Sequence, residues 1–315
     1  MVAPPPWGNR RGLRSIVRTE RLPALDALRG AAALVVLSYH VASVYGLGGQ
    51  PNGYLAVDFF FMLSGFVIAR VLERGSRTPT QFLKWRYTRF WPTMAVGTAL
   101  GLCFVPGTYS QALPGLLLIP ILVGKYIFPF NPPAWSIFFE LCANAVHSVL
   151  RRFWPAVFAV SLFWLMVTGG FGGGPNPDNV MRGLPRVLMA YSIGVMMFQR
   201  WGDHPPLKLS PYWGLLLLAV LLPVRSLWFD YAFVLLICPL VIMNGTRGSL
   251  PFATELGTLS FPLYAVHYPL LLAAKSAGAN AISAGALAIA VAAAMSAISA
   301  PIVRSSRDDA LAPAP

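Results

Sequence analysis

The residues best suited to chemistry are an arginine and a histidine in the first apolar stretch, Arg29 and His40. In a helix this spacing corresponds to about three turns and about 16 Å of rise, so both side chains would lie on one face. An imidazole, with a solution pKa of about 6.5, suits proton transfer near neutral pH. The alternative is a snorkelling arginine and a hydrogen-bonded packing histidine. The pair therefore predicts a functional helix face, with simple packing as its rival.

Three further ionisable residues, Asp58, Glu140 and His267, also lie in apolar stretches, where such groups by default indicate function. We expect them at a depth similar to that of His40, so that two histidines and two carboxylates would form an acid–base site. A carboxylate bound to one ring nitrogen would fix the histidine tautomer and favour the imidazolium. The sequence leaves open which carboxylate pairs with which histidine, and Asp58 could instead cap the start of its helix.

A basic, aromatic-rich segment at residues 82–92 contains Arg86 and Arg89, three positions apart. On a helix this spacing places both on one face. Arginine forks suit phosphate oxygens. Interfacial arginines and aromatic residues also anchor helices among lipid headgroups, and that alternative stays open.

These residues must be positioned by elements that lie in lipid. Of the 315 residues, 56% are hydrophobic and only 11% are charged, whereas soluble domains carry about 25% charged residues. The net charge of +13 is not an indication of nucleic-acid binding, because the basic residues fall between apolar runs rather than along one stripe. The lipid bilayer is the predicted partner, and no nucleic acid is.

The predicted fold class is all-α, a polytopic integral membrane helical bundle with about ten transmembrane helices. A span needs roughly 20 mainly apolar residues. The candidate spans are 24–46, 54–72, 90–107, 134–150, 153–170, 185–200, 209–224, 228–245, 256–274 and 281–303, and the segment 112–124, broken by Pro114 and Pro120, is expected either to re-enter or to cross. Residues 1–20 are predicted to be a basic, disordered cytoplasmic tail, 21–303 the transmembrane domain and 304–315 a disordered tail.

The distribution of basic residues predicts the orientation. With ten spans and both termini in the cytoplasm, most of the 24 Lys and Arg residues fall inside, and those on the outer side are Lys125, Arg182, Arg186, Arg225 and Lys275. This asymmetry follows the positive-inside rule. It places Arg29 near the cytoplasm and His40 in the outer half.

Five segments in this order resemble the acyltransferase 3 family. They are 25–30 leading to Tyr39 and His40; 53–66, a phenylalanine-rich run ending in Leu-Ser-Gly-Phe; 82–92 with its paired arginines; 135–140; and 257–269. The last resembles a Ser-Tyr-x-x-Tyr-x-x-His-x-Pro motif, although Phe261 stands where the family typically has tyrosine. The similarity extends from residue 22 to about residue 275.

The resemblance implies a membrane O-acyltransferase that moves an acyl group, often acetyl, from acyl-CoA to a hydroxyl of a carbohydrate or lipid-linked glycan. It implies that His40 is the general base or an acyl relay supported by Glu140, and that Arg29, Arg86 and Arg89 bind the donor's phosphates. Asp58 and His267 complete the expected catalytic set. Trp135, Ser136 and Tyr264, within the motifs, are assigned to substrate binding.

No metal and no tightly bound cofactor are expected, and the implied location is a bacterial inner membrane. The rival functions are a transporter or flippase, since intramembrane His, Asp and Glu also form proton relays, and a non-catalytic scaffold.

Overall fold

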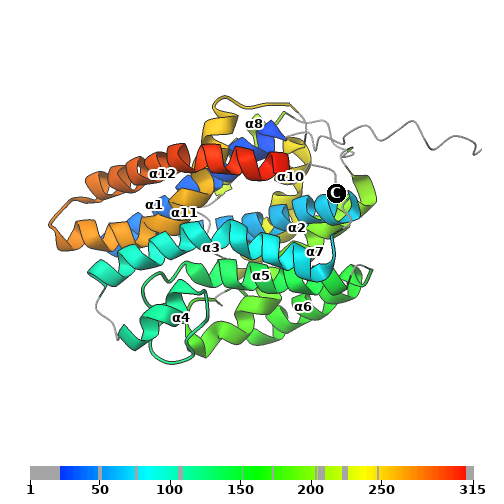
Figure 1. Cartoon of the computed structure of the whole chain (residues 1–315). Helices are drawn as coiled ribbons and strands as arrows, with labels where there is room; N and C mark the ends of the chain where they lie inside the picture. The colour runs from blue at the N-terminus through cyan, green and yellow to red at the C-terminus, as the bar shows by residue number, and fades with distance from the viewer. Residues whose placement is uncertain are drawn as a thin grey trace, which may run out of the picture.

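Helices make up all the regular structure in the described part of the chain. The computed structural model describes residues 22–48, 52–74, 77–105, 109–150, 152–171, 174–202, 204, 210–221, 226–246 and 248–309. The α-helices are α1 (Pro23–Tyr45), α2 (Ala56–Arg74), α3 (Pro79–Phe104), α4 (Ala112–Leu116), α5 (Ala134–Val149), α6 (Trp154–Thr168), α7 (Val180–Trp201), α8 (Tyr212–Leu221), α9 (Leu227–Ala232), α10 (Cys238–Gly245), α11 (Ala253–Ser276) and α12 (Ala281–Asp309) (Figure 1). A π-helical turn, Phe233–Ile237, joins α9 to α10. The all-α prediction is confirmed for these residues.

Five of the described helices are long and apolar enough to cross a membrane. They are Pro23–Tyr45, Gly53–Glu73, Leu227–Gly245, Ala253–Ser276 and Ala281–Ile298. The apolar helix α6 is shorter but exposes Val160, Phe163 and Val167 by about two-thirds each, as a lipid-facing surface would. The chain is therefore a multi-pass membrane protein, and the count of about ten spans stays a prediction.

Several predicted boundaries differ from the structure. α12 continues to Asp309, into the segment predicted to be a disordered tail from residue 304. Within 112–124 only Ala112–Leu116 is helical, and the chain after it lacks regular structure. The predicted tail at 1–20 lies outside the described residues, as does Arg225 of the predicted outer loops.

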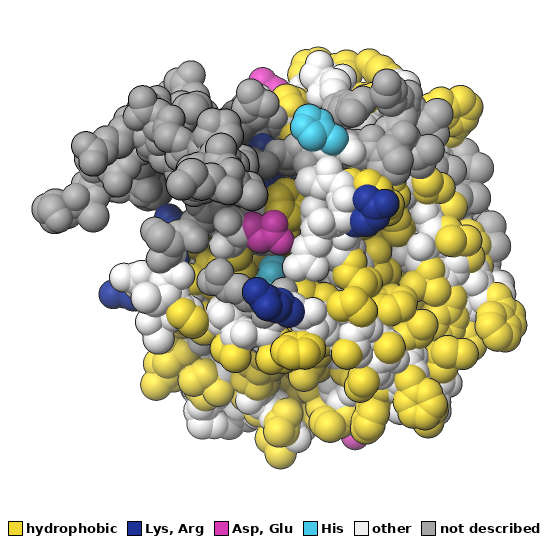
Figure 2. All heavy atoms as spheres, turned by 90° about the vertical axis from the view of Figure 1, so that its right-hand side faces the viewer, with side chains coloured by type: hydrophobic (Ala, Val, Ile, Leu, Met, Phe, Trp, Pro, Cys, Tyr) yellow, Lys and Arg dark blue, Asp and Glu magenta, His cyan; other side chains and the backbone are white. Residues whose placement is uncertain are grey.

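Six helices form a closed ring, in the order α1, α2, α7, α5, α3, α11 and back to α1. α12 packs outside α11, α6 packs outside α7, and α8 packs against α10 (Figure 1). The end of the ring where α1 begins is called the Arg29 end below, and the end where α1 finishes at Tyr45 is called the His40 end. On the face seen in Figure 2, apolar side chains cover most of the lower and right-hand surface, and most of the charged ones gather towards the upper and central part.

Small residues bring two pairs of ring helices into backbone contact. A Cβ atom at Gly194 of α7 would overlap the carbonyl oxygen of Met62 on α2, and one at Gly65 would overlap the carbonyl oxygen of Tyr191. A Cβ atom at Gly30 of α1 would likewise overlap Leu256 of α11, at 2.5 Å from its Cβ and 2.6 Å from its carbonyl oxygen. Glycine at these points lets backbones approach as in other membrane helix pairs.

Two prolines in α11 set the shape of the helix that contains His267. Pro262 and Pro269 lack the N–H that would bond the carbonyls of Thr258 and Ala265, four residues earlier. Asn131 Nδ2 donates to the Ala265 carbonyl at 2.9 Å, and Ser296 Oγ of α12 donates to the Thr258 carbonyl at 3.2 Å. Asn131 thus satisfies one released carbonyl, while Ser296 shares its single hydroxyl hydrogen between the Thr258 carbonyl and the carbonyl of Ala292, which lies closer at 2.8 Å.

Candidate active site

Two histidines meet at the His40 end of the ring. His40 of α1 and His267 of α11 have ring centroids 4.9 Å apart, and His267 Nε2 lies 3.1 Å from His40 Nδ1. His267 is buried, whereas His40 is partly exposed. The two histidines therefore lie in direct contact, and His40 is the more exposed of the two.

The hydrogen bonds around the pair define its tautomers. His267 Nδ1 lies 2.8 Å and 3.0 Å from the carbonyl oxygens of Tyr264 and Leu263. Carbonyl oxygens only accept, so His267 Nδ1 bears the hydrogen and its neutral Nε2 is an acceptor. His40 Nδ1, 3.0 Å from the Val36 carbonyl and 3.1 Å from His267 Nε2, must then donate.

This assignment leaves His40 Nε2 with its lone pair and no hydrogen, which is the form needed by a general base. When that nitrogen takes up a proton, the positive ring keeps its Nδ1–H bonded to two acceptors. His267 therefore does for His40 what an acidic residue does in a catalytic triad, although as a neutral partner.

Neither predicted carboxylate contacts a histidine within the described residues. Asp58, third in α2 and so not a helix cap, bonds Arg186 of α7 through both oxygens, at 2.9 Å to Nε and 2.6 Å to Nη2. Arg186 also donates to the carbonyls of Phe171 and Tyr54. Arg186, which the charge count assigns to the outer side, lies within the bundle and is almost completely buried.

Glu140 of α5 pairs with Arg86 of α3 rather than with His40. Its Oε1 lies 2.6 Å from Arg86 Nη2 and also accepts a 2.6 Å hydrogen bond from Ser64 on α2. Arg86 packs over the ring of Phe90 at 4.3 Å, and Phe90 packs on Phe261. An apolar ring at position 261 thus has a packing role that needs no hydroxyl.

Arg86 and Arg89 do not present one common surface. Arg86 is buried and its charge is neutralised by Glu140, whereas Arg89 is exposed. The three-residue spacing turns the side chains by about 60° relative to each other, which suffices here to put one inside the ring and the other outside. The pair therefore does not form a single phosphate-binding face.

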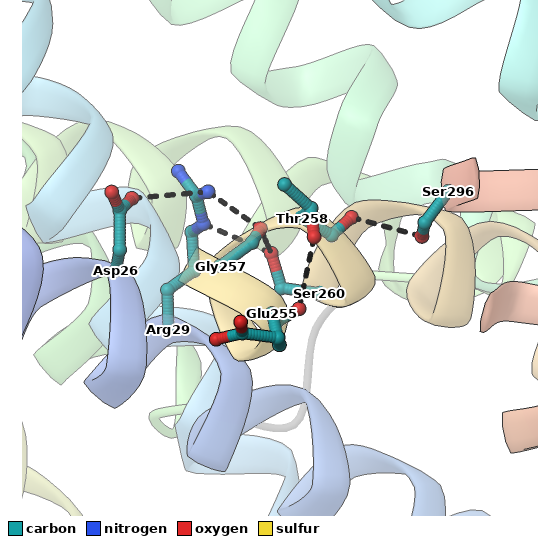
Figure 3. Close-up of polar contacts among 7 residues, drawn as sticks. All are labelled: Asp26, Arg29, Glu255, Gly257, Thr258, Ser260 and Ser296. Atoms are coloured by element: carbon teal, nitrogen blue, oxygen red, sulfur yellow. Dashed lines mark hydrogen bonds and ion pairs between the residues drawn. The ribbon is translucent and has the colours of Figure 1, made fainter. Parts of the chain in front are cut away.

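Arg29 lies at the opposite end of the ring from His40 and also faces α11. Its Nε donates to Ser260 Oγ at 2.9 Å and its Nη2 donates to the Gly257 carbonyl at 2.7 Å, while Asp26 Oδ1 lies 3.2 Å from Nη2 (Figure 3). The side chain is 35% exposed, and its Nη1 bonds none of the residues drawn in Figure 3. A fixed guanidinium with an unused N–H pair can bind a phosphate.

The residues assigned to substrate binding are buried. Ser136 Oγ and Tyr264 Oη are 2.5 Å apart, and both lie 3.1 Å from the Pro133 carbonyl. One hydroxyl hydrogen goes to that carbonyl and the other to the neighbouring hydroxyl, so neither remains for a substrate. Trp135 packs on Arg186, with the guanidinium 5.5 Å from its ring. All three tie helices together.

Sequence reasoning missed the Arg186 pairing and a further carboxylate, Asp230 of α9, which accepts a 2.5 Å hydrogen bond from Tyr54. It also missed His147 of α5, whose Nδ1 lies 2.9 Å from Tyr191 Oη in a buried cluster. Asp230 could have been found, because it is an acidic residue within an apolar run.

Comparison with known proteins connects this arrangement to a family. The acyltransferase 3 model, described as an acyltransferase domain, matches residues 22–304. Protein 2 in picA locus of Rhizobium radiobacter is 34% identical over 157 residues, 41% of this chain and 82% of the relative. Exopolysaccharide production protein ExoZ of Rhizobium meliloti is 28% identical over 254 residues, 72% of this chain and 79% of the relative.

Peptidoglycan O-acetyltransferase OatA of Listeria monocytogenes is 25% identical over 160 residues, 46% of this chain and 25% of the relative. No solved structure matches. The family match covers nearly all of the described bundle, including both histidines and Arg29. The chain therefore belongs to the acyltransferase 3 family and is a membrane enzyme that transfers acyl groups.

Proposed function

We propose that this protein transfers an acetyl group from cytoplasmic acyl-CoA to a hydroxyl of an envelope or secreted carbohydrate on the outward side of a bacterial inner membrane. Both termini would be cytoplasmic, with about ten spans. Among its relatives are a protein named for exopolysaccharide production and one named peptidoglycan O-acetyltransferase. The single observation that carries the proposal is the His40–His267 pair, with its unprotonated Nε2 on the partly exposed ring.

The donor would bind with its phosphates at Arg29. The described side chains there already hold the guanidinium in one orientation and leave Nη1 for an anion. The thioester lies at the far end of a flexible arm, so it can extend along the α1–α11 seam towards His40. About 16 Å of helix separates Arg29 from His40. Arg86, neutralised by Glu140, has no part in phosphate binding in this mechanism.

The chemical step uses His40 as base and then as acid. His40 Nε2 takes the proton of the acceptor hydroxyl as its oxygen attacks the thioester carbonyl. The tetrahedral intermediate collapses, the carbon–sulfur bond breaks, and the CoA sulfur takes the proton back from His40 Nε2. The products are a carbohydrate ester and free CoA, and no cofactor is consumed. His267 keeps the reactive nitrogen of His40 unprotonated at the start of each cycle.

The test measures transfer of label from radiolabelled acetyl-CoA to a mixture of envelope glycans by the purified protein in nanodiscs. Replacing His40 with alanine should lower kcat by at least about 100-fold, because general acid–base catalysis contributes about 10²–10⁴-fold. His204 is one of the four histidines and lies near the C-terminal end of α7, so His204→Ala is the matched control and should transfer normally.

Undiminished transfer by His40→Ala would remove this residue from the mechanism. Uptake of a glycan into vesicles without any acylation would instead favour a transporter.

A further inference from the structure

Asp230 is a buried carboxylate at the His40 end that the reaction above does not use. Only 6% of the residue is exposed. Its Oδ2 accepts the hydrogen bond from Tyr54, but Oδ1 is buried and has no hydrogen-bond partner in the described structure. A carboxylate can accept about four hydrogen bonds, and a buried acceptor without one needs an explanation.

The charge of Asp230 is also unmatched. Arg186, the nearest cation, is taken by Asp58 through both carboxylate oxygens. Tyr54 connects the two groups, because its carbonyl accepts from Arg186 and its hydroxyl donates to Asp230. No described cation forms an ion pair with Asp230, so the burial of its carboxyl group is not offset by a counter-charge within the described residues. A neutral ligand rich in hydroxyl donors would satisfy Oδ1 without disturbing the Asp58–Arg186 pair.

Asp230 is connected to His40 through two aromatic rings. The Tyr54 ring lies 6.3 Å from that of Tyr39, and the Tyr39 ring lies 5.1 Å from that of His40. A ligand with one hydroxyl at His40 Nε2 would therefore have its next unit near Tyr54 and Asp230. An extended chain of sugar units carries hydroxyl groups on successive units in this way.

Aromatic residues on either side of Asp230 in α9 extend to the protein surface. Tyr231 packs on Phe171 at 5.0 Å and on Trp228 at 6.5 Å. Trp228 is 76% exposed. Sugar rings present apolar C–H faces that pack on aromatic rings, while their hydroxyls bond to a few placed polar groups. The aromatic residues here would pack on the sugar rings, and the unpartnered carboxylate would bond a sugar hydroxyl.

We propose that Tyr39, Tyr54, Asp230 and Trp228 form a subsite for the carbohydrate acceptor, in which Asp230 Oδ1 accepts a hydrogen bond from a sugar hydroxyl. The inference rests on the proposed function, since it identifies where that acceptor binds. It predicts that Asp230 affects the binding of the acceptor and does not affect the binding of the acyl-CoA donor.

The experiment uses the full chain in nanodiscs, radiolabelled acetyl-CoA as donor, and three acceptor probes: cellotetraose, laminaritetraose and oligosaccharides released from the producing cell's exopolysaccharide. Asp230→Asn keeps the shape of the side chain but removes its charge and one acceptor oxygen. We expect the acceptor KM to rise about tenfold or more, as for loss of a hydrogen bond to a charged group. The KM for acetyl-CoA and its slow hydrolysis without acceptor should not change.

Matched controls separate this effect from general damage. Glu73→Gln removes an exposed carboxylate at the end of α2 and should leave both KM values unchanged. Trp228→Ala should raise the acceptor KM, whereas Trp213→Ala, which removes another exposed tryptophan on α8, should not. An unchanged acceptor KM in Asp230→Asn would overturn the subsite, as would an equal loss in donor KM and hydrolysis.

If the wild-type protein transfers no acetyl group to any probe, the proposed function fails while the subsite is still testable. Equilibrium dialysis with tritiated oligosaccharides then decides. Binding that Asp230→Asn weakens about tenfold or more supports the subsite. Binding that is absent, or unaffected by the substitution, overturns it.

Discussion

The helix pairs α1–α11 and α2–α7 each contain an arginine within the ring. The two arginines differ in how many hydrogen-bond partners they have and in how much of the side chain is exposed. Arg186 on α7 bonds both oxygens of Asp58 and two carbonyls, and its side chain is 4% exposed. Arg29 on α1 bonds a hydroxyl, a carbonyl and a nearby carboxylate, and it is 35% exposed.

The difference indicates which arginine is used up in holding the fold and which one retains donors for a ligand. A guanidinium whose donors are all used and whose charge is matched has no capacity for a ligand. One that is oriented by its neighbours but retains donors can bind an anion without first being ordered. The same contrast separates His147, buried against Tyr191, from the partly exposed His40.

The largest effect is expected in the α2–α7 pair. Arg186→Met would leave Asp58 buried without its counter-charge, which costs about 3–5 kcal/mol. We expect little folded protein, measured as the unfolding temperature of the protein in nanodiscs. Arg29→Met, at the partly exposed position, should unfold near the wild-type temperature although it cannot bind donor phosphates. Equal unfolding temperatures for the two variants would remove the contrast.

The next effect concerns the α1–α11 pair and the rate of reaction. His267→Ala removes the acceptor for His40 Nδ1–H, so His40 is no longer confined to the productive tautomer. We expect kcat to fall about 100-fold, within the range for general acid–base catalysis, with both KM values unchanged. The fold should persist because the ring helices keep their other contacts.

His267→Gln supplies the matched test, since its side-chain oxygen can accept from His40 Nδ1. We expect part of kcat to return. A glutamine variant as slow as the alanine variant would show that His267 does more than accept this hydrogen bond. Wild-type kcat in both variants would mean that His40 needs no positioning residue.

The sequence predicted the helical bundle and the shared direction of Arg29 and His40 on α1, because both depend on local information. The length of an apolar run predicts a membrane-spanning helix. The 3.6-residue helical period places Arg29 and His40 on one face of α1. In the structure this face lies against α11. It did not predict the partners of the carboxylates. Similar depth along a helix says nothing about which neighbour a side chain faces, and Asp58 and Glu140 face arginines on α7 and α3.

The paired arginines and Arg186 show the same limit. The spacing of Arg86 and Arg89 is compatible with one face, but the edge of the ring falls between them. Arg186 lies near the start of an apolar run, so counting charges assigns it to the outer side and gives it no partner. Only the packing of α7 on α2 turns it inward, and that contact depends on two glycines distant in sequence, Gly65 and Gly194.

The smallest effect is expected for two serines near Arg29, one that touches the guanidinium and one that does not. Ser260 accepts from Arg29 Nε, and Ser296 lies near the Thr258 carbonyl (Figure 3). Ser296 donates its single hydroxyl hydrogen to the carbonyl of either Thr258 or Ala292. Ser260→Ala should raise the KM for acetyl-CoA about tenfold, because a hydrogen bond to a charged group contributes about 1.5 kcal/mol or more. Ser296→Ala should leave that KM unchanged, and kcat should be near wild type in both. Steady-state kinetics at saturating acceptor measures all four values. If both substitutions raise the KM equally, looser packing of α11 is the cause, and the fixed orientation of Arg29 is not what binds the donor.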